Sequence, residues 1–400
     1  MRIPAELSAL EATVGYPLGG RGREAPRAAR VGQEPLAALV SAIEATLDSG
    51  PPAVAFSGGR DSSLLLAAAV LACGRAGLEP PLPITLCMPS TVEEADERAW
   101  QELVLEHLGI SDWHRIEIEG ELDLVGPYAR QHLLRDGLLF PANAHSVVPM
   151  LEAAGERPLI VGLGGDELLS PQQWGSVHDL LARRRSPEQR DILRLAACVI
   201  PTAIRRFARP VPMQMLDEMH WLRPAAKSRL VSSVRRAFEQ PVAWRAAITD
   251  LAARRDVVLP LRTMERLASA GGRKMVAPFL DPAFVGALAR AGGLCGWGTR
   301  TATMDVLARD LLPAKLVGRK SKAYFNRVFF GEESRAFAAA WSGRGLDETL
   351  IDAQALRQEW LSDVPDFRTA VLLQSAWLAD HAFAISAADR KFDVVPARCA

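Results

Sequence analysis

The chain has 400 residues, of which 49% are hydrophobic, and its formal net charge is zero. This content allows a sizeable core and predicts two or three domains or one large two-lobed unit. The first residues carry no secretory signal, no apolar run has the length of a membrane span, and the five cysteines are scattered without a Cys-x-x-Cys pair. We therefore expect a cytoplasmic protein with reduced thiols, no membrane partner and no structural zinc.

Although the net charge of the chain is zero, two of its segments carry opposite net charges. Residues 84–179 carry 17 acidic and 5 basic side chains, whereas residues 183–245 carry 14 basic and 5 acidic ones. A basic segment can attract an anionic partner. This one has few aromatic residues and no nucleic-acid motif, so we interpret it as a solvated surface or a contact between lobes and disfavour a nucleic-acid partner.

The N-terminal half alternates between helical and strand-like patterns. Residues 1–35 are rich in glycine, proline and arginine, which predicts a flexible extension with a short helix over residues 4–12. A helix is expected over residues 36–47, and strands are expected at residues 54–56, 82–88, 114–118 and 159–163. Helices between them are expected after residue 62, over residues 93–108 and over residues 122–134. This alternation predicts an α/β lobe with a parallel sheet over residues 36–180.

Beyond residue 180 strand-like runs almost vanish, so residues 181–400 are predicted to form a mostly helical lobe. Candidate helices run over residues 187–197, 212–220, 225–238, 242–253, 263–269, 282–289, 301–311, 332–341, 353–360 and 367–387. Six tryptophans of this half are expected to be core or helix-packing residues, namely Trp221, Trp244, Trp297, Trp341, Trp360 and Trp377.

The segment Ser57-Gly58-Gly59-Arg60-Asp61-Ser62-Ser63 stands between the first strand and its helix. The glycines let the backbone approach a ligand, and the first amides of a helix have no internal partners. Together with the helix dipole these features make an anion cradle, most often for phosphate. The segment matches neither the Walker loop nor the dinucleotide fingerprint.

A second motif, Gly162-Leu163-Gly164-Gly165-Asp166-Glu167, follows the fourth expected strand. The carboxyl ends of parallel strands meet at one edge of a sheet, so Asp166 is expected to face Asp61 there. Two carboxylates suit a Mg²⁺ ion.

The first motif resembles the pyrophosphate-binding loop of the ATP pyrophosphatases (PP-loop enzymes). Together the two motifs resemble the synthetase domain of asparagine synthetases and of their relatives, the β-lactam synthetases and lasso-peptide cyclases. The segments at residues 275–282 and 312–325 are similar to this family's Pro-Phe-Leu-Asp and basic catalytic segments, so the resemblance covers about residues 36–390. Asp281-Pro282 also fits an ordinary helix start.

The resemblance implies ATP and Mg²⁺ as cofactors, with ATP cut between its α and β phosphates. Asp61 and Asp166 would hold the metal, and Lys322 or Lys320 would stabilise charge at the attacked phosphate. Glu167 is the candidate general base. The residues expected around the nucleotide are Phe56, Ser57, Gly58, Gly59, Asp61, Ser62, Ser63, Leu86, Met88 and Gly164.

Two departures from the family pattern narrow the predicted activity. Residue 2 is Arg and only 35 residues precede the matched region, so we expect no ammonia production from glutamine. Leu163 stands where relatives often carry an acid or a tyrosine that deprotonates the attacking amine.

The sequence therefore predicts an AMP-forming ligase that joins a small-molecule or peptide carboxylate to an amine or ammonia, as in natural-product or macrolactam formation. A partner protein that delivers substrate fits this scheme. The alternatives are asparagine synthesis from ammonia, a tRNA-modifying PP-loop enzyme and a non-catalytic ATP-binding subunit.

Overall fold

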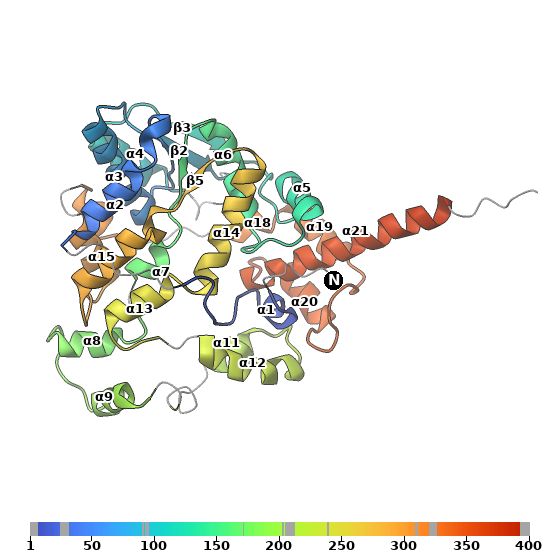
Figure 1. Cartoon of the computed structure of the whole chain (residues 1–400). Helices are drawn as coiled ribbons and strands as arrows, with labels where there is room; N and C mark the ends of the chain where they lie inside the picture. Colours follow the sequence, from blue (N-terminus) through green and yellow to red (C-terminus); the bar gives the residue numbers. More distant parts are fainter. Residues whose placement is uncertain are drawn as a thin grey trace, which may run out of the picture.

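A five-stranded, entirely parallel sheet lies at the centre of the molecule (Figure 1). The computed structural model describes residues 7–24, 32–89, 92, 96–170, 172–201, 204, 213–237, 240–308, 311–319 and 326–392. The strands are β1 (Ala53–Ala55), β2 (Leu82–Cys87), β3 (His114–Glu117), β4 (Leu159–Ile160) and β5 (Met275–Val276). Their order is β3-β2-β1-β4-β5, so β1 is the central strand. The predicted α/β fold is confirmed.

The edge strand β5 comes from the part of the chain predicted to be helical. Backbone N–H groups of Leu159 and Val161 donate to the carbonyls of Lys274 and Val276, both at 2.9 Å. A strand of two residues is too short to show an alternating pattern, so only its pairing with β4 defines it. The C-terminal half of the chain therefore completes the sheet.

Helices cover both faces of the sheet, as Figure 1 shows: α2 (Pro35–Glu44), α3 (Arg60–Ala76) and α15 (Pro282–Gly292) on one, and α6 (Val147–Ala154) and α14 (Arg255–Ala270) on the other. Val54 and Ile160 belong to the core on the α3 side, whereas Ala53 and Leu159 belong to the core on the α6 side. Successive residues of a strand point to opposite faces, which explains why these strands are apolar throughout.

The first of these cores draws on both halves of the chain. It joins buried residues between Ala38 and Leu169 to others between Trp244 and Val317. The division into lobes at residue 180 stays a prediction, and this core crosses it.

The other helices before residue 200 are α1 (Ala9–Val14), α4 (Arg98–Leu108), α5 (Pro127–Asp136), α7 (Gly165–Leu169), α8 (Gly175–Leu181) and α9 (Asp191–Val199). Those after it are α11 (Met213–Glu218), α12 (Pro224–Ala237), α13 (Trp244–Leu251), α16 (Arg300–Ala308), α17 (Ala314–Val317), α18 (Asn326–Phe329), α19 (Glu332–Ala340), α20 (Ala353–Trp360) and α21 (Ala370–Phe392). No helix among the described residues is long and apolar enough to cross a membrane.

Helix α14 begins at Arg255, earlier than the helix expected over residues 263–269, and it contains Pro260. Proline usually ends or kinks a helix because it lacks an N–H group, so the first turns were not recognised. Val257, Val258 and Leu259 are buried there, and their packing maintains the helix through the proline.

Five of the six tryptophans expected in the core are buried. Trp341 and Trp360 are both fully buried, with ring centroids 4.8 Å apart, in the core formed by α19, α20 and α21. Trp297 is only partly buried and packs edge-on against Trp244 at 5.3 Å. The interpretation of these residues as helix-packing residues is confirmed.

The segment from residue 7 to residue 24 packs against the rest of the molecule, whereas the sequence indicated a loosely ordered extension. Ser8 and Glu11 form a capping box at the start of α1. The Glu11 carboxylate, 6% exposed, also accepts a bond from Arg255 at 2.5 Å. The Tyr16 hydroxyl donates to Asp256. These bonds fix the segment to the N-terminus of α14, a contact between residues too far apart in sequence for a local pattern to predict.

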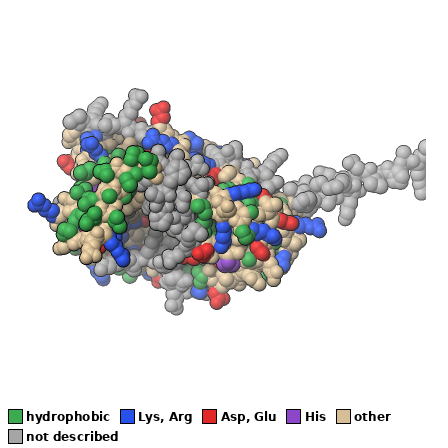
Figure 2. Space-filling model, turned by 90° about the horizontal axis from the view of Figure 1, so that it is seen from below, with side chains coloured by type: hydrophobic (Ala, Val, Ile, Leu, Met, Phe, Trp, Pro, Cys, Tyr) green, Lys and Arg blue, Asp and Glu red, His purple; other side chains and the backbone are tan. Residues whose placement is uncertain are grey.

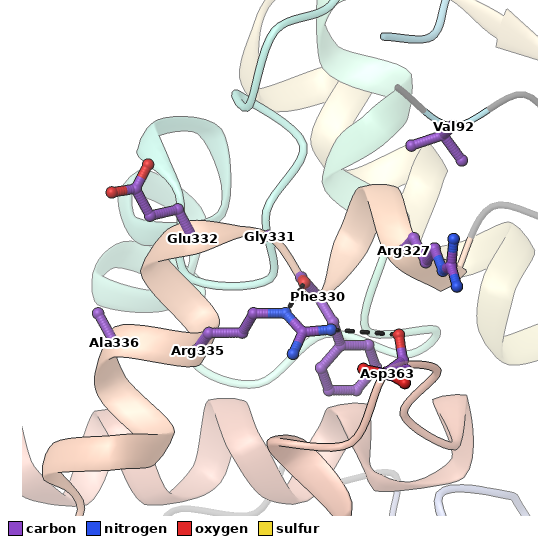
Figure 3. A pocket seen from close by; sticks show the side chains of 8 residues that line it. All are labelled: Val92, Arg327, Phe330, Gly331, Glu332, Arg335, Ala336 and Asp363. Carbon is purple, nitrogen blue, oxygen red and sulfur yellow. Dashed lines mark hydrogen bonds between the residues drawn. The ribbon is translucent and has the colours of Figure 1, made fainter. Parts of the chain in front are cut away.

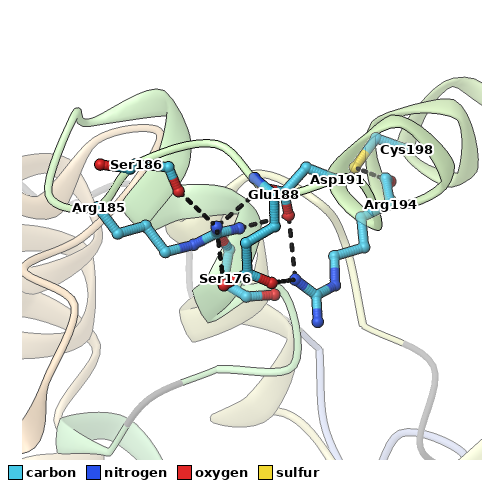
Figure 4. Close-up of polar contacts among 7 residues, drawn as sticks. All are labelled: Ser176, Arg185, Ser186, Glu188, Asp191, Arg194 and Cys198. Carbon is cyan, nitrogen blue, oxygen red and sulfur yellow. Dashed lines mark hydrogen bonds and ion pairs between the residues drawn. The ribbon is translucent and has the colours of Figure 1, made fainter.

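Helix α9 carries its apolar side chains on the outside. Ile192 and Leu193 are each 74% exposed and Val199 is 83% exposed. Figure 2, which views the molecule from below, shows hydrophobic side chains gathered on the side where Figure 1 places α8 and α9. Polar contacts of the buried Asp191 hold α9 in this orientation instead: its carboxylate accepts from Arg185 at 2.5 Å and from Arg194 at 3.0 Å (Figure 4).

Candidate active site

The turn after β1 has the geometry of an anion-binding loop. Gly58 has φ +79°, and a Cβ there would lie 2.8 Å from the Gln101 side chain. The Ser57 and Ser62 hydroxyls lie 3.1 Å apart, and Ser57 N–H donates to the Ser62 hydroxyl at 3.2 Å. No side chain caps α3 at Gly59. The open N-terminus of a 17-residue helix therefore follows a loop whose hydroxyls are already ordered, which favours an anionic ligand.

Asp61 and Asp166 lie together, as the two motifs predicted, and both bind Arg300. The Arg300 guanidinium donates to Asp61 Oδ2 at 2.5 Å, to Asp166, and to the Ser170 hydroxyl at 3.1 Å. Asp61 comes from the first turn of α3, Asp166 from α7 and Arg300 from the start of α16. The sequence analysis missed Arg300 because a lone arginine at a helix start belongs to no motif.

Gly165 lets α7 approach Asp61 this closely, and Gly164 allows the turn before it. A Cβ on Gly165 would lie 2.5 Å from Asp61 Oδ2. Gly164 has φ +93°, and a Cβ there would lie 2.6 Å from Leu280. A side chain at position 165 would push the second motif away from Asp61, so the approach of the two carboxylates requires Gly165. Gly164 is required instead by its positive φ and by the closeness of Leu280.

The carboxylates fit a divalent cation. Asp61 Oδ1 is buried and has no hydrogen-bond partner among the described residues. Burial raises the pKa of Asp61, and Arg300 opposes that rise. No group of three or more His, Cys, Asp or Glu side chains in the described part of the chain could hold a metal. The protein would therefore offer Mg²⁺ two carboxylates, and phosphate or water oxygens would complete its shell.

Glu167, the candidate base, follows Asp166 in α7. Burial raises its pKa, and the negative charges of Asp166, Asp256 and Asp61 add to the effect. A carboxyl group with a raised pKa exchanges protons nearer to neutral pH. Leu163 is partly buried among apolar side chains on both sides of the sheet, and it has no group that could accept a proton.

The remaining residues predicted around the nucleotide differ in exposure. Leu86 and Met88, at the carboxyl end of β2, are only partly buried and can contact a ligand. The Phe56 side chain is 1% exposed and packs in the core, and Ser63 is fully buried. Phe56 and Ser63 therefore support the loop from beneath, and their side chains have no surface for a ligand.

Lys320 and Lys322 lie outside the described residues, but the chain that leads to them is anchored at the loop. Arg319, 7% exposed, donates two bonds to the carboxylate of Glu97, 9% exposed. The Arg319 guanidinium also stacks on Trp100, with 4.7 Å to the ring centroid. The Glu97 carbonyl lies 3.4 Å from the Cβ position of Gly58. The basic segment therefore begins beside the anion-binding loop.

A cavity of about 700 Å³ is lined by residues that follow the basic segment in the chain (Figure 3). Its lining has both charge signs and a hydrophobic wall, and consists of Val92, Arg327, Phe330, Gly331, Glu332, Arg335, Ala336 and Asp363. Arg335 donates to the backbone carbonyls of Phe330 and Asp363, each at 3.3 Å, as Figure 3 shows.

The sequence was compared with models of known protein families, and the match covers the residues of this site. The model of the asparagine synthase family matches residues 36–379, which include both motifs, β5 and the basic segment. The chain therefore belongs to the asparagine synthase family. This family consists of ATP-dependent amide-forming ligases, and the chain is assigned to that class. A search of curated proteins returned no match.

Proposed function

We propose that this protein adenylates a carboxylate, releases pyrophosphate and transfers the acyl group to an amine, leaving AMP. The observation that carries the proposal is the convergence of Asp61 and Asp166 beside the ordered Ser57–Ser62 loop. Such a site holds the β and γ phosphates, which leaves the bond between the α and β phosphates as the one to be cut. We further propose that the reaction runs in the cytoplasm and serves natural-product or peptide biosynthesis, such as macrolactam formation.

In the first step, a carboxylate oxygen attacks the α phosphorus and the bond to the oxygen shared with the β phosphorus breaks. The Ser57 and Ser62 hydroxyls and the first amides of α3 hold the departing pyrophosphate. Mg²⁺ on Asp61 and Asp166 would neutralise part of its charge. Lys322 or Lys320 is proposed to stabilise the charge that develops at the α phosphate.

In the second step, the amine nitrogen attacks the acyl carbon, AMP leaves and the nitrogen loses a proton. Leu163 cannot accept that proton, whereas Glu167 is a partly buried carboxyl group whose raised pKa suits the transfer. The mixed lining of the cavity beside Arg335 suits the acyl substrate or the amine. A partner protein could present a peptide substrate at this open side.

The test is a screen of amino acids, dicarboxylic acids and peptides for carboxylate-dependent exchange of labelled pyrophosphate into ATP. We expect exchange with at least one acid, AMP as the nucleotide product, and loss of exchange in Asp61→Asn. Release of ADP would contradict the proposal, and so would an absence of exchange with every acid. Conversion of aspartate and ammonia into asparagine would assign the chain to simple asparagine synthesis instead.

A further inference from the structure

The Arg300 guanidinium occupies the position between the two carboxylates proposed to hold the metal. It contacts Asp61 Oδ2 at 2.5 Å and the carboxylate of Asp166, and its side chain is only 19% exposed. The Ser170 hydroxyl, 3.1 Å away, fixes the same guanidinium from a third side. These contacts come from α3 and from α7 with its C-cap Ser170, so the fold holds the arginine in place.

Unmatched atoms remain in this cluster. Asp61 Oδ1 and Arg300 Nε are both buried without a hydrogen-bond partner in the described part of the molecule. A second cation, Arg60, donates to Thr301 at 3.3 Å and lies near enough to Arg300 for their charges to repel. Buried polar groups normally find partners, so this cluster is left with one acceptor and one donor unmatched.

We propose that Arg300 is a placeholder cation: its ion pairs and the binding of Mg²⁺ by Asp61 and Asp166 exclude each other, and the nucleotide's phosphates release it. A divalent cation bound between these two carboxylates would lie within a few ångströms of the guanidinium, where like charges repel strongly. A triphosphate beside the loop gives the guanidinium another anionic partner, since arginine binds phosphate with paired N–H donors. Mg²⁺ and nucleotide would then enter together, and each would raise the affinity for the other. This inference rests on the metal and nucleotide roles proposed above.

Direct binding tests the inference without turnover. Mg²⁺ is titrated calorimetrically into the full chain, alone and with α,β-methylene-ATP, which cannot be cut between the α and β phosphates. For the native chain we expect weak binding of Mg²⁺ alone and at least tenfold tighter binding with the analogue. In Arg300→Ala, Mg²⁺ alone should bind at least tenfold tighter than in the native chain, and the effect of the analogue should shrink correspondingly.

Three further variants make the result specific. Arg300→Lys keeps a cation and should retain weak binding of Mg²⁺ alone, whereas Arg300→Gln should behave like Arg300→Ala and replaces it if the alanine variant does not fold. Arg75→Ala removes an exposed arginine at the far end of α3, where it pairs with Glu44, and should match the native chain.

Unchanged or weaker binding of Mg²⁺ alone in Arg300→Ala and Arg300→Gln overturns the inference. The proposed function and this inference can fail separately. A chain that shows no pyrophosphate exchange can still show tighter Mg²⁺ binding in these two variants.

Discussion

Gly165 decides whether the carboxylates of the two motifs can meet. Gly165 has no side chain at the point where Asp61 passes, and the space between its Cβ position and Asp61 Oδ2 is only 2.5 Å. The spacing of glycines and acids predicted that both motifs border one site. It could not predict which glycine contacts which carboxylate, because that depends on how α7 packs against α3.

Replacement of Gly165 by alanine should therefore weaken nucleotide binding more than it weakens the fold. The new methyl group displaces the Asp61 carboxylate, and we expect at least a tenfold loss of affinity for Mg²⁺ with α,β-methylene-ATP, which corresponds to about 1.4 kcal/mol. Gly162→Ala is the control, because its Cβ would lie 3.9 Å from Leu65, an ordinary contact distance. Equal affinities in the two variants would show that the site does not depend on this approach.

At the scale of single elements, ion pairs and hydrogen bonds rather than apolar packing hold helix α9 in position. Asp191 is 4% exposed at its side chain and accepts from Arg185, Arg194 and the Glu188 N–H, while Arg185 also donates to the Ser176 carbonyl of α8 at 2.9 Å. These contacts, drawn in Figure 4, connect α9 to α8. The Arg185 side chain, by its hydrogen bond above all, holds the pKa of Asp191 well below its usual range.

Asp191→Asn should loosen α9 without unfolding the protein, because the neutral amide cannot match a carboxylate that binds two arginines. We expect trypsin to cleave the chain between residues 183 and 199 at least threefold faster, measured by mass spectrometry of timed digests. Glu188→Gln is the control, since the Glu188 side chain is 61% exposed and its arginine contacts are as long as 3.7 and 3.8 Å. Equal cleavage of both variants would contradict a structural role for Asp191.

At the scale of the whole molecule, contacts between distant segments unite the sheet, the helical part and the N-terminus. β5 brings the C-terminal half into the sheet, and residues 7–24 dock at the start of α14. Glu11 is central to this docking because it accepts from Arg255, from Leu18 N–H at 2.7 Å and from Ser8 N–H at 2.8 Å. Burial alone would raise the pKa of Glu11, but these bonds outweigh it and lower the pKa.

Glu11→Ala should therefore destabilise the whole protein. It removes the carboxylate that accepts from Arg255 and from the Leu18 and Ser8 N–H groups. Breaking a buried pair costs about 3 kcal/mol. Chemical denaturation should show this loss in the free energy of unfolding. Arg21→Ala breaks a pair in which the arginine is 61% exposed, so it should cost about 1 kcal/mol or less. A smaller effect for Glu11→Ala than for Arg21→Ala would mean that the N-terminal segment contributes little to stability.

The sequence by itself determined the parallel α/β fold, the anion-binding turn after β1 and the family, because glycine spacing and apolar periodicity are local properties of the backbone. It also placed Asp61 and Asp166 at one edge of the sheet, since parallel strands align their carboxyl ends. Only the tertiary structure revealed Arg300 between them, β5 beside β4 and Glu11 bound to Arg255. Each of these contacts joins residues more than 100 positions apart in the chain. A local sequence pattern does not specify which distant partner a charged residue or a very short strand will contact.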